Sequence, residues 1–315
     1  MPGPRLGAGH SCVTLDLMET VVRTRDGADL HVEVDDGPGP TVVLVHGFTA
    51  RLEEFALQRE TLRGRARTVL YDCRGHGRSR GRGKIQSATI DRLGIDLGEV
   101  LDAVAPRGPV VLLGHSMGGM TIMALARQRP ELFGERVAGA FLLATSSGGL
   151  VEAGPLGLAV RIARRLGLLQ LFLWLTMLWS PVLERFRKRG TRLGTRLYRQ
   201  YLFGSDDAQP EQVRLVQDLL EQTPMTVTTA FYKTLFEHDE HASLAAMRDI
   251  PVTLLVGDSD RLTPVSHSRR MYEALPDAEL IVVPGAGHSV NITRQDVVDD
   301  ALLRLLDRVE QQRAA

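Results

Sequence analysis

The sequence predicts an α/β protein in which a doubly wound, mostly parallel sheet is interrupted by an inserted helical segment. Short apolar runs without alternation recur along the chain, and such runs are typical of strands that are buried on both faces of a parallel sheet. Amphipathic helical patterns separate several of these runs, as strand–helix alternation requires. One long stretch without strand signals interrupts the alternation, and we interpret it as the insertion.

The first predicted elements form a β-hairpin, because Leu17–Thr24 and Asp29–Val34 flank a turn at Asp26-Gly27. The second of these segments alternates apolar and polar residues, which is the period expected of a strand. Further strands are predicted wherever an apolar run ends in turn residues, namely at Thr41–Val45, Arg67–Tyr71, Val110–Leu113, Val137–Ala144, Thr253–Val256 and Glu279–Val283.

Helices are predicted between and after these strands. Apolar residues from Ile90 to Val104 recur at the spacing of one helical face. Met117–Gln128 and Val265–Leu275 have the composition of further helices, and Thr293–Arg308 is the predicted closing helix.

These elements divide the chain into a core and an insertion. Residues 1–15 are expected to be a flexible N-terminus, and residues 16–145 and 249–315 are expected to build one α/β core. Residues 146–248 contain no convincing strand and are rich in Leu and Arg. An insertion of about 100 residues is too long for a plain loop. We therefore predict a helical cap over the carboxyl ends of the strands, where open α/β sheets have their sites.

The charge is balanced, with 38 Lys and Arg against 38 Asp and Glu, so no global field favours nucleic acid as a partner. Cys12 and Cys73 are the only cysteines and do not form a disulfide framework. The most apolar stretch, Leu166–Trp179, has 14 residues, which is fewer than the roughly 18 to 20 that span a bilayer. With no signal-peptide pattern at the start, we expect a cytoplasmic protein.

The clearest chemical motif is G-x-S-x-G, which the chain carries as Gly114-His115-Ser116-Met117-Gly118. A predicted strand precedes the motif and a predicted helix follows it, and in this context the serine occupies a sharp turn called a nucleophile elbow. Side chains at the two glycines would collide with neighbouring backbone, and the N-terminus of the helix favours developing negative charge. Ser116 is therefore the predicted nucleophile.

A serine nucleophile needs a base, and the base needs a group that orients it. His288 follows a predicted strand and is flanked by small residues, so we expect its imidazole at the same edge of the sheet as Ser116. Asp258 and Asp260 both follow the preceding strand and compete for the role of the acid. Asp258 suits a turn-capping role. Asp260 is favoured, because Thr and Pro follow it three and four residues later.

The oxyanion of an acyl-transfer reaction needs backbone N–H donors, each worth about 3 kcal/mol of transition-state stabilisation. Met117, directly after the nucleophile, is one predicted donor. Phe48 is the other, because Gly47 lets the loop after Thr41–Val45 approach the elbow. The alternative interpretation of Gly47 is a plain turn without a role in catalysis.

Together these motifs resemble the α/β-hydrolase superfamily over the whole chain except its first 15 or so residues and the insertion. The resemblance is carried by His46-Gly47-Phe48, Asp72-Cys73-Arg74-Gly75-His76-Gly77-Arg78-Ser79, Gly114-His115-Ser116-Met117-Gly118-Gly119, Gly257, Asp260, Pro264 and Gly287-His288. It implies that Asp72, Arg74 and His76 hold loops in place. It also implies no metal and no organic cofactor, and the sequence has no H-E-x-x-H motif or dinucleotide fingerprint.

These residues predict hydrolysis of a carboxylic ester through an acyl-enzyme, with a small apolar ester as the partner molecule. The stretch Leu166–Trp179 favours an acyl-chain or lipid-like substrate over a sugar or nucleotide. That stretch either packs the cap onto the core or, with the arginines around it, makes a peripheral contact with anionic lipid.

The same triad also serves thioesterases, cofactor-free haloperoxidases or perhydrolases, and hydrolases of carbon–carbon bonds. A non-catalytic ligand-binding relative is a further alternative. Epoxide hydrolases and haloalkane dehalogenases are disfavoured, since they carry Asp where this chain has Ser116. The oligomeric state does not follow from the sequence.

Overall fold

The computed structural model describes residues 17–79, 88–150, 162, 165–180, 202–204 and 208–314 of the 315-residue chain. The expected flexible segment 1–15, with Cys12, lies outside the described residues, and so does much of the predicted cap.

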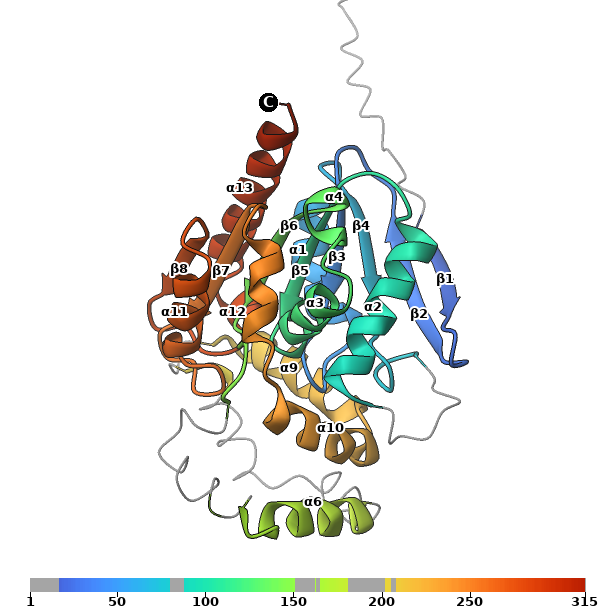
Figure 1. The fold of residues 1–315 in the computed structure, drawn as a ribbon, viewed down its shortest axis with the longest axis vertical. Helices are drawn as coiled ribbons and strands as arrows, with labels where there is room; N and C mark the ends of the chain where they lie inside the picture. The colour runs from blue at the N-terminus through green and yellow to red at the C-terminus, as the bar shows by residue number, and fades with distance from the viewer. Residues whose placement is uncertain are drawn as a thin grey trace, which may run out of the picture.

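One sheet of eight strands forms the centre of the molecule (Figure 1), in the order β1-β2-β4-β3-β5-β6-β7-β8. β2 pairs antiparallel with β1 and β4, and the other neighbours pair in parallel. The strands are β1 (Leu17–Arg23), β2 (Asp29–Asp35), β3 (Thr41–Val45), β4 (Arg67–Tyr71), β5 (Val110–His115), β6 (Val137–Leu143), β7 (Val252–Gly257) and β8 (Glu279–Val283). The predicted doubly wound, mostly parallel sheet is confirmed, and strand ends differ from the prediction by at most two residues.

Helices cover both faces of this sheet and enclose a separate hydrophobic core on each (Figure 1). The core on one face contains residues of α2 (Ile90–Val104), α3 (Met117–Gln128) and α11 (Val265–Ala274). The core on the other face contains residues of α1 (Ala56–Leu62) and α13 (Gln295–Ala314).

β3 shows why its apolar run does not alternate with polar residues. Val43 and Val45 point into the first core, and Val42 and Leu44 point into the second. Successive side chains of a strand face opposite sides of the sheet, so a strand that is covered on both faces needs apolar residues throughout.

The sequence patterns fail at the edge of the sheet and near the chain end. β8 is the last strand of the order, and only Val283 of its five residues is buried, so burial on both faces was a wrong expectation for this strand. The predicted closing helix Thr293–Arg308 is instead the longer α13, because buried residues continue as far as Val309. It follows the short helix α12 (Val290–Thr293), and α4 (Leu132–Glu135) and the 3-10 helix η1 (Leu52–Phe55) are further short elements.

Between β6 and β7 the described residues form helices and no strand. These elements are α6 (Leu168–Leu178), α9 (Pro210–Gln222), α10 (Met225–Glu237) and the 3-10 helix η3 (His241–Met247). α10 packs against α2 and α6, and α6 lies at the end of the molecule, apart from the sheet (Figure 1). Within the described segments, no helix is both long and apolar enough to cross a membrane.

Buried polar side chains tie together the loops that follow β3 and β4. The Asp72 carboxylate accepts hydrogen bonds from the backbone N–H groups of Leu52 (2.9 Å) and Arg78 (2.7 Å). The His46 Nε2 atom accepts one from the N–H of Cys73 at 2.8 Å. These bonds satisfy buried backbone donors that a loop would otherwise leave unpaired, so the two loops keep one relative position.

The contacts of two further side chains, His76 and Arg74, extend this network. His76 Nε2 accepts a hydrogen bond from the N–H of Thr49 at 3.2 Å. The Arg74 guanidinium binds both oxygens of the fully buried Asp96 at 2.7 and 2.8 Å, and it also pairs with Asp26 at 2.9 Å. Asp72, Arg74 and His76 therefore join loops, which is the position that a structural role requires.

We predict that Arg74→Met lowers the free energy of unfolding by about 3 kcal/mol, because it removes the bidentate partner of a buried carboxylate. Urea unfolding monitored by circular dichroism measures this change. The matched control is Arg65→Met, which breaks the exposed pair with Asp307 and should cost less than about 1 kcal/mol. Equal costs for the two variants would show that the Arg74 pair does not hold the loops.

Candidate active site

Ser116 lies between β5 and α3 with φ 52° and ψ −116°, a conformation that is strained for a residue with a side chain. Its backbone is held on both sides, since its N–H donates to the Leu143 carbonyl at 2.9 Å and its carbonyl accepts the Thr145 hydroxyl at 2.6 Å. Strained backbone persists only where surrounding contacts enforce it. The strand–turn–helix context predicted for G-x-S-x-G is thus present at Ser116.

Two glycines let other backbone segments approach this turn. A Cβ atom on Gly118 would lie 1.9 Å from the Val45 carbonyl oxygen, and one on Gly114 would lie 2.5 Å from the Gly118 carbonyl carbon. No side chain fits at either position. The end of β3 therefore passes directly beside the first turn of α3, and it brings the loop that contains Phe48 to Ser116.

The two predicted oxyanion donors are the backbone N–H groups of Phe48 and Met117. Within the described part of the chain, neither Phe48 N–H nor Met117 N–H donates a hydrogen bond. The neighbouring amides of Gly47 and Thr49, in contrast, donate to buried side chains. Met117 is buried, and unpaired buried amides are rare. Two free N–H groups beside a strained serine can bind a developing negative charge.

His288 and Asp260 form a direct hydrogen bond beyond the carboxyl ends of β8 and β7. His288 Nδ1 lies 2.8 Å from Asp260 Oδ2, and both side chains are buried. Asp260 also accepts hydrogen bonds from the N–H of Leu262 and from the N–H and hydroxyl of Thr263, at 2.8 to 2.9 Å. With its proton on Nδ1, the imidazole has a free Nε2 that can accept a proton.

The surroundings of Asp260 determine whether its carboxyl is charged. Burial alone would raise the pKa of Asp260, but the attraction and hydrogen bond of His288, with the donors of Thr263, lower this pKa to about 2. Asp260 is thus an anion at neutral pH and stabilises positive charge on His288.

Asp258, the competing acid, makes different contacts. Its exposed carboxylate accepts hydrogen bonds from Gly285 N–H at 2.8 Å and from the Ser259 hydroxyl at 3.0 Å. These bonds connect the loops after β7 and β8, and none of the contacts of Asp258 in the described residues reaches His288. Asp260, rather than Asp258, therefore occupies the position from which a carboxylate can orient the imidazole.

Sequence reasoning missed a second buried pair, Glu54 and His115, directly behind these residues. His115 Nδ1 lies 2.9 Å from Glu54 Oε1, and the other Glu54 oxygen accepts the N–H of Gly47 at 2.8 Å. On its far side, His115 Nε2 donates to the backbone carbonyl of His288 at 3.0 Å. The pair thus joins the loop of Phe48 to the loop of His288.

Glu54 and His115 are both buried and form a carboxylate–imidazole pair. Burial opposes charge on each group, but their mutual attraction lowers the pKa of Glu54 and raises the pKa of His115. His115 also brings the elbow and the base together, since its ring centroid is 4.9 Å from that of His288. His115 is the variable residue before Ser116 in the motif, and no sequence signal links it to Glu54.

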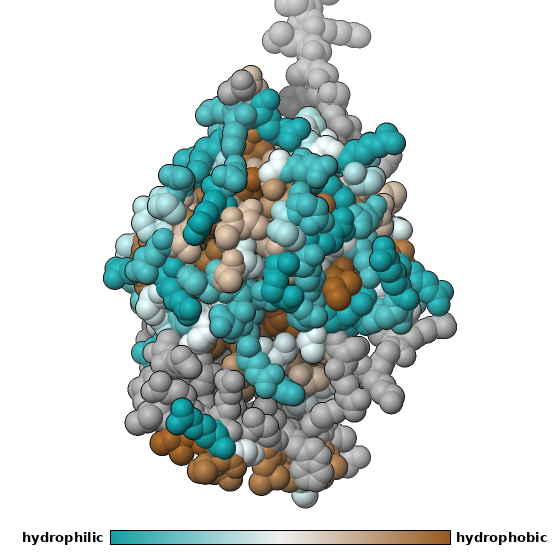
Figure 2. Space-filling model, in the orientation of Figure 1, coloured by the Kyte–Doolittle hydropathy of each residue, from teal (hydrophilic) through white to brown (hydrophobic). Residues whose placement is uncertain are grey.

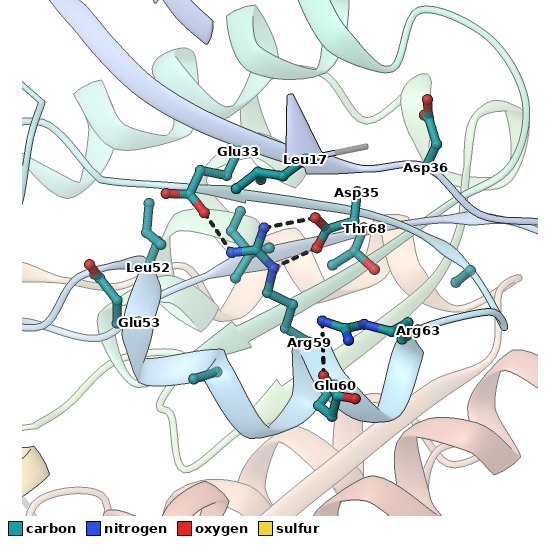
Figure 3. A pocket seen from close by; sticks show the side chains of 13 residues that line it. Leu17, Glu33, Asp35, Asp36, Leu52, Glu53, Arg59, Glu60, Arg63 and Thr68 are labelled. Atoms are coloured by element: carbon teal, nitrogen blue, oxygen red, sulfur yellow. Dashed lines mark hydrogen bonds and ion pairs between the residues drawn. The ribbon is translucent and has the colours of Figure 1, made fainter. Parts of the chain in front are cut away.

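A separate cavity of about 560 Å³ lies between α1 and the strands β2 and β4 (Figure 3). Arg59 extends into it and binds both oxygens of Asp35, at 2.5 and 2.8 Å, and one oxygen of Glu33 at 2.5 Å. None of the predicted site residues lines this cavity, and its central cation is already paired. It is therefore not the candidate active site.

The described residues contain no group of three or more His, Cys, Asp or Glu side chains that is arranged to hold a metal ion. The residues around Ser116 instead provide a hydroxyl on a strained backbone turn, an oriented imidazole and free N–H groups. This combination is suited to acyl transfer.

Comparison with known proteins agrees with this geometry. Residues 42–301 match the sequence model of the alpha/beta hydrolase family. The chain is 29% identical over 292 residues to a Caulobacter sp. (strain K31) protein provisionally named carbamate hydrolase RutD, covering 90% of this chain and 97% of the relative. It is 28% identical over 267 residues to the pimeloyl-[acyl-carrier protein] methyl ester esterase of Nitrosomonas europaea, covering 83% and 93%.

A third relative is longer than this chain. The match to the dihydrolipoyllysine-residue acetyltransferase component of the acetoin cleaving system of Pseudomonas putida is 27% identical over 275 residues, and it spans 85% of this chain but only 64% of the relative. Among solved structures, a thermophilic esterase from Thermogutta terrifontis superposes with a TM-score of 0.71 at 24% identity, covering 93% of this chain and 99% of that chain. At this identity the likeness shows the fold.

The lowered pKa of Asp260 predicts a pH dependence of stability. A carboxyl whose pKa falls from 3.8 to about 2 on folding stabilises the fold by about 2 kcal/mol above pH 4, and this stabilisation is lost as the pH falls towards 2. The variant Asp260→Asn has no carboxyl to titrate at this position and therefore lacks this pH-dependent stabilisation. The difference in unfolding free energy between wild type and Asp260→Asn should therefore shrink by about 1 kcal/mol from pH 6 to pH 3.

Urea unfolding at the two pH values measures this difference, with the exposed neighbour Asp258→Asn as the matched control. A difference for Asp260→Asn that stays constant with pH would contradict a charged Asp260 in the folded protein.

A second prediction concerns Glu54. Glu54→Gln retains an acceptor for Gly47 N–H, whereas Glu54→Ala removes both that acceptor and the partner of His115. If the anchored loop positions Phe48, Glu54→Ala should lower kcat by about 10- to 100-fold and Glu54→Gln should lower it less. Steady-state turnover of an activated ester, with circular dichroism to check folding, provides the comparison. Equal losses in kcat would mean that the hydrogen bond to Gly47 N–H does not position the loop.

Proposed function

Since the chain belongs to the alpha/beta hydrolase family, we propose that it is a serine hydrolase that cleaves a carboxylic ester with an apolar acyl group. The observation that carries this proposal is the buried 2.8 Å hydrogen bond between His288 and Asp260, close to the strained Ser116 and two free N–H groups. Ser116, His288 and Asp260 are the proposed catalytic triad, and Phe48 and Met117 are the proposed oxyanion donors.

The proposed reaction has two halves. His288 Nε2 accepts the proton of the Ser116 hydroxyl while its oxygen attacks the ester carbonyl, and the oxyanion accepts hydrogen bonds from Phe48 and Met117 N–H. His288 then gives this proton to the departing alkoxide, which leaves as an alcohol, and the acyl group stays on Ser116. A water molecule loses its proton to His288, attacks the acyl carbonyl, and releases the acid as the proton returns to Ser116.

Asp260 accelerates both halves without exchanging a proton. Its pKa of about 2 keeps it anionic while the imidazolium forms, and its hydrogen bond to Nδ1 keeps Nε2 available as the base. The Leu262 and Thr263 donors hold the carboxylate in place, so little reorganisation is needed at the moment of proton transfer.

An aromatic cluster beside the oxyanion loop supports an apolar acyl group. The Phe48 ring contacts Phe231 and Tyr232 of α10, with ring centroids 6.1 and 5.7 Å away, and Tyr232 stacks on Phe236. Apolar walls with few polar groups are typical of sites for apolar small molecules. The ester linkage itself agrees with the name of the Nitrosomonas europaea relative, a methyl ester esterase.

We expect the wild-type chain to hydrolyse p-nitrophenyl esters, with the best rate for an acyl chain that fills the site next to the aromatic cluster. Ser116→Ala should lose turnover on the order of a million-fold, because no other group replaces the nucleophile. Release of p-nitrophenolate, measured across a series of chain lengths, gives both results.

Ser243→Ala is the control, since that hydroxyl binds only the Glu240 carbonyl in the described residues and it should leave turnover intact. If the wild type cleaves none of the esters, or if Ser116→Ala is as active as wild type, the proposal is wrong. Thioester and diketone substrates would then separate the other hydrolase chemistries from simple ligand binding.

A further inference from the structure

α6 presents a continuous apolar stripe to solvent. Its residues recur every three or four positions, so they share one face of the helix and its last turn. We call this set the α6 stripe, and it consists of Leu168, Leu171, Phe172, Leu175, Leu178 and Trp179. Each of the six side chains is between 40% and 60% exposed, and Figure 2 shows brown surface at this end of the molecule.

Such a stripe is unusual on a helix of a folded protein. A surface helix normally turns its apolar face towards the core, and contiguous exposed apolar patches mark interaction sites. α6 packs against α10 and lies away from the sheet (Figure 1). With 11 residues it is about 16 Å long, too short to cross the roughly 30 Å of a hydrocarbon core. The helix could therefore contact a bilayer only by lying along its surface.

The charge of the chain is strongly segregated along the sequence. Residues 153–205 contain ten basic residues and one acidic residue, whereas the rest of the chain contains 28 basic and 37 acidic residues. The segment around α6 thus carries a formal charge of +9, and the remainder carries −9. Exposed Arg165 lies just before the stripe. The overall neutrality of the chain conceals this separation of positive and negative charge along the sequence.

We propose that α6 docks on the surface of an anionic lipid bilayer, with the α6 stripe in the boundary between headgroups and acyl chains. Apolar side chains in this boundary and cations among anionic headgroups are the two contributions that bind interfacial helices. The acidic remainder of the chain is repelled by the same surface, so the charge segregation also orients the molecule with α6 towards the lipid.

A second copy of the chain fits this surface less well. Pairing two α6 stripes face to face would join two chains through helices that each belong to a sequence segment of charge +9, and like charges oppose association. An anionic bilayer instead neutralises these charges while it covers the apolar side chains.

Docking through α6 would bring the proposed site close to the bilayer. α6 packs on α10, and α10 contributes Phe231 and Tyr232 to the cluster around Phe48. One helix layer therefore separates the bilayer-facing stripe from the oxyanion loop. The docking itself does not depend on the proposed hydrolysis, because lipid binding does not require Ser116.

Co-sedimentation of the full chain with vesicles tests the inference. We expect binding to phosphatidylcholine vesicles that contain ~30% phosphatidylglycerol, weaker binding to phosphatidylcholine alone, and a decrease as NaCl is added. The double variant Leu171→Asp/Phe172→Asp should lower the partition coefficient at least about tenfold. The experiment measures vesicle binding rather than turnover. A failure of the docking proposal can therefore be told apart from a failure of the proposed hydrolysis.

The matched control is Leu17→Asp/Met18→Asp. These adjacent residues of β1 are 51% and 50% exposed, close to the 51% and 59% of Leu171 and Phe172, and the change in charge is the same. This control should bind like wild type, and circular dichroism should show both variants folded. Absence of vesicle binding, equal binding to neutral vesicles, or undiminished binding of Leu171→Asp/Phe172→Asp would each overturn the proposal. So would stripe-dependent self-association without vesicle binding.

Discussion

The close packing of Gly118 against the end of β3 determines the geometry of the candidate site. Because a Cβ atom at Gly118 would lie 1.9 Å from the Val45 carbonyl oxygen, only glycine permits this approach. The packing fixes the loop of Phe48 relative to the elbow of Ser116, and hence the two free N–H groups relative to the hydroxyl.

Two buried carboxylate–imidazole pairs extend this arrangement outward. Asp260 and His288 form one at the ends of β7 and β8, and Glu54 and His115 form the other behind the elbow. Charged groups are costly to bury unless they are paired and hydrogen-bonded, and each of these carboxylates also accepts backbone N–H bonds. The hydrogen bond from His115 to the His288 carbonyl links the two pairs, so displacing one loop would disturb the others.

The α6 stripe and the candidate site are connected through α10. Core helices of this protein bury their apolar faces in the two cores beside the sheet. In contrast, α6 exposes its apolar face within a strongly basic stretch of the sequence. The same composition that makes the chain neutral overall therefore gives it two oppositely charged parts. The aromatic residues of α10 contact Phe48, and α10 also packs against α6, so one helix connects the exposed stripe to the candidate site.

The sequence by itself determined the features that depend on local patterns. β3, β4 and α3 have the bounds predicted from apolar runs and helical spacing, because a buried strand or helix needs apolar residues at fixed positions. Ser116, Asp260 and His288 could be proposed for the same reason, since each follows a strand end in a short motif. Only the tertiary structure decided between the contacts of Asp258 and Asp260, paired Glu54 with His115, and made β8 an edge strand. These features depend on which distant segments become neighbours, and burial, pKa and hydrogen bonding arise only after the chain has brought them together.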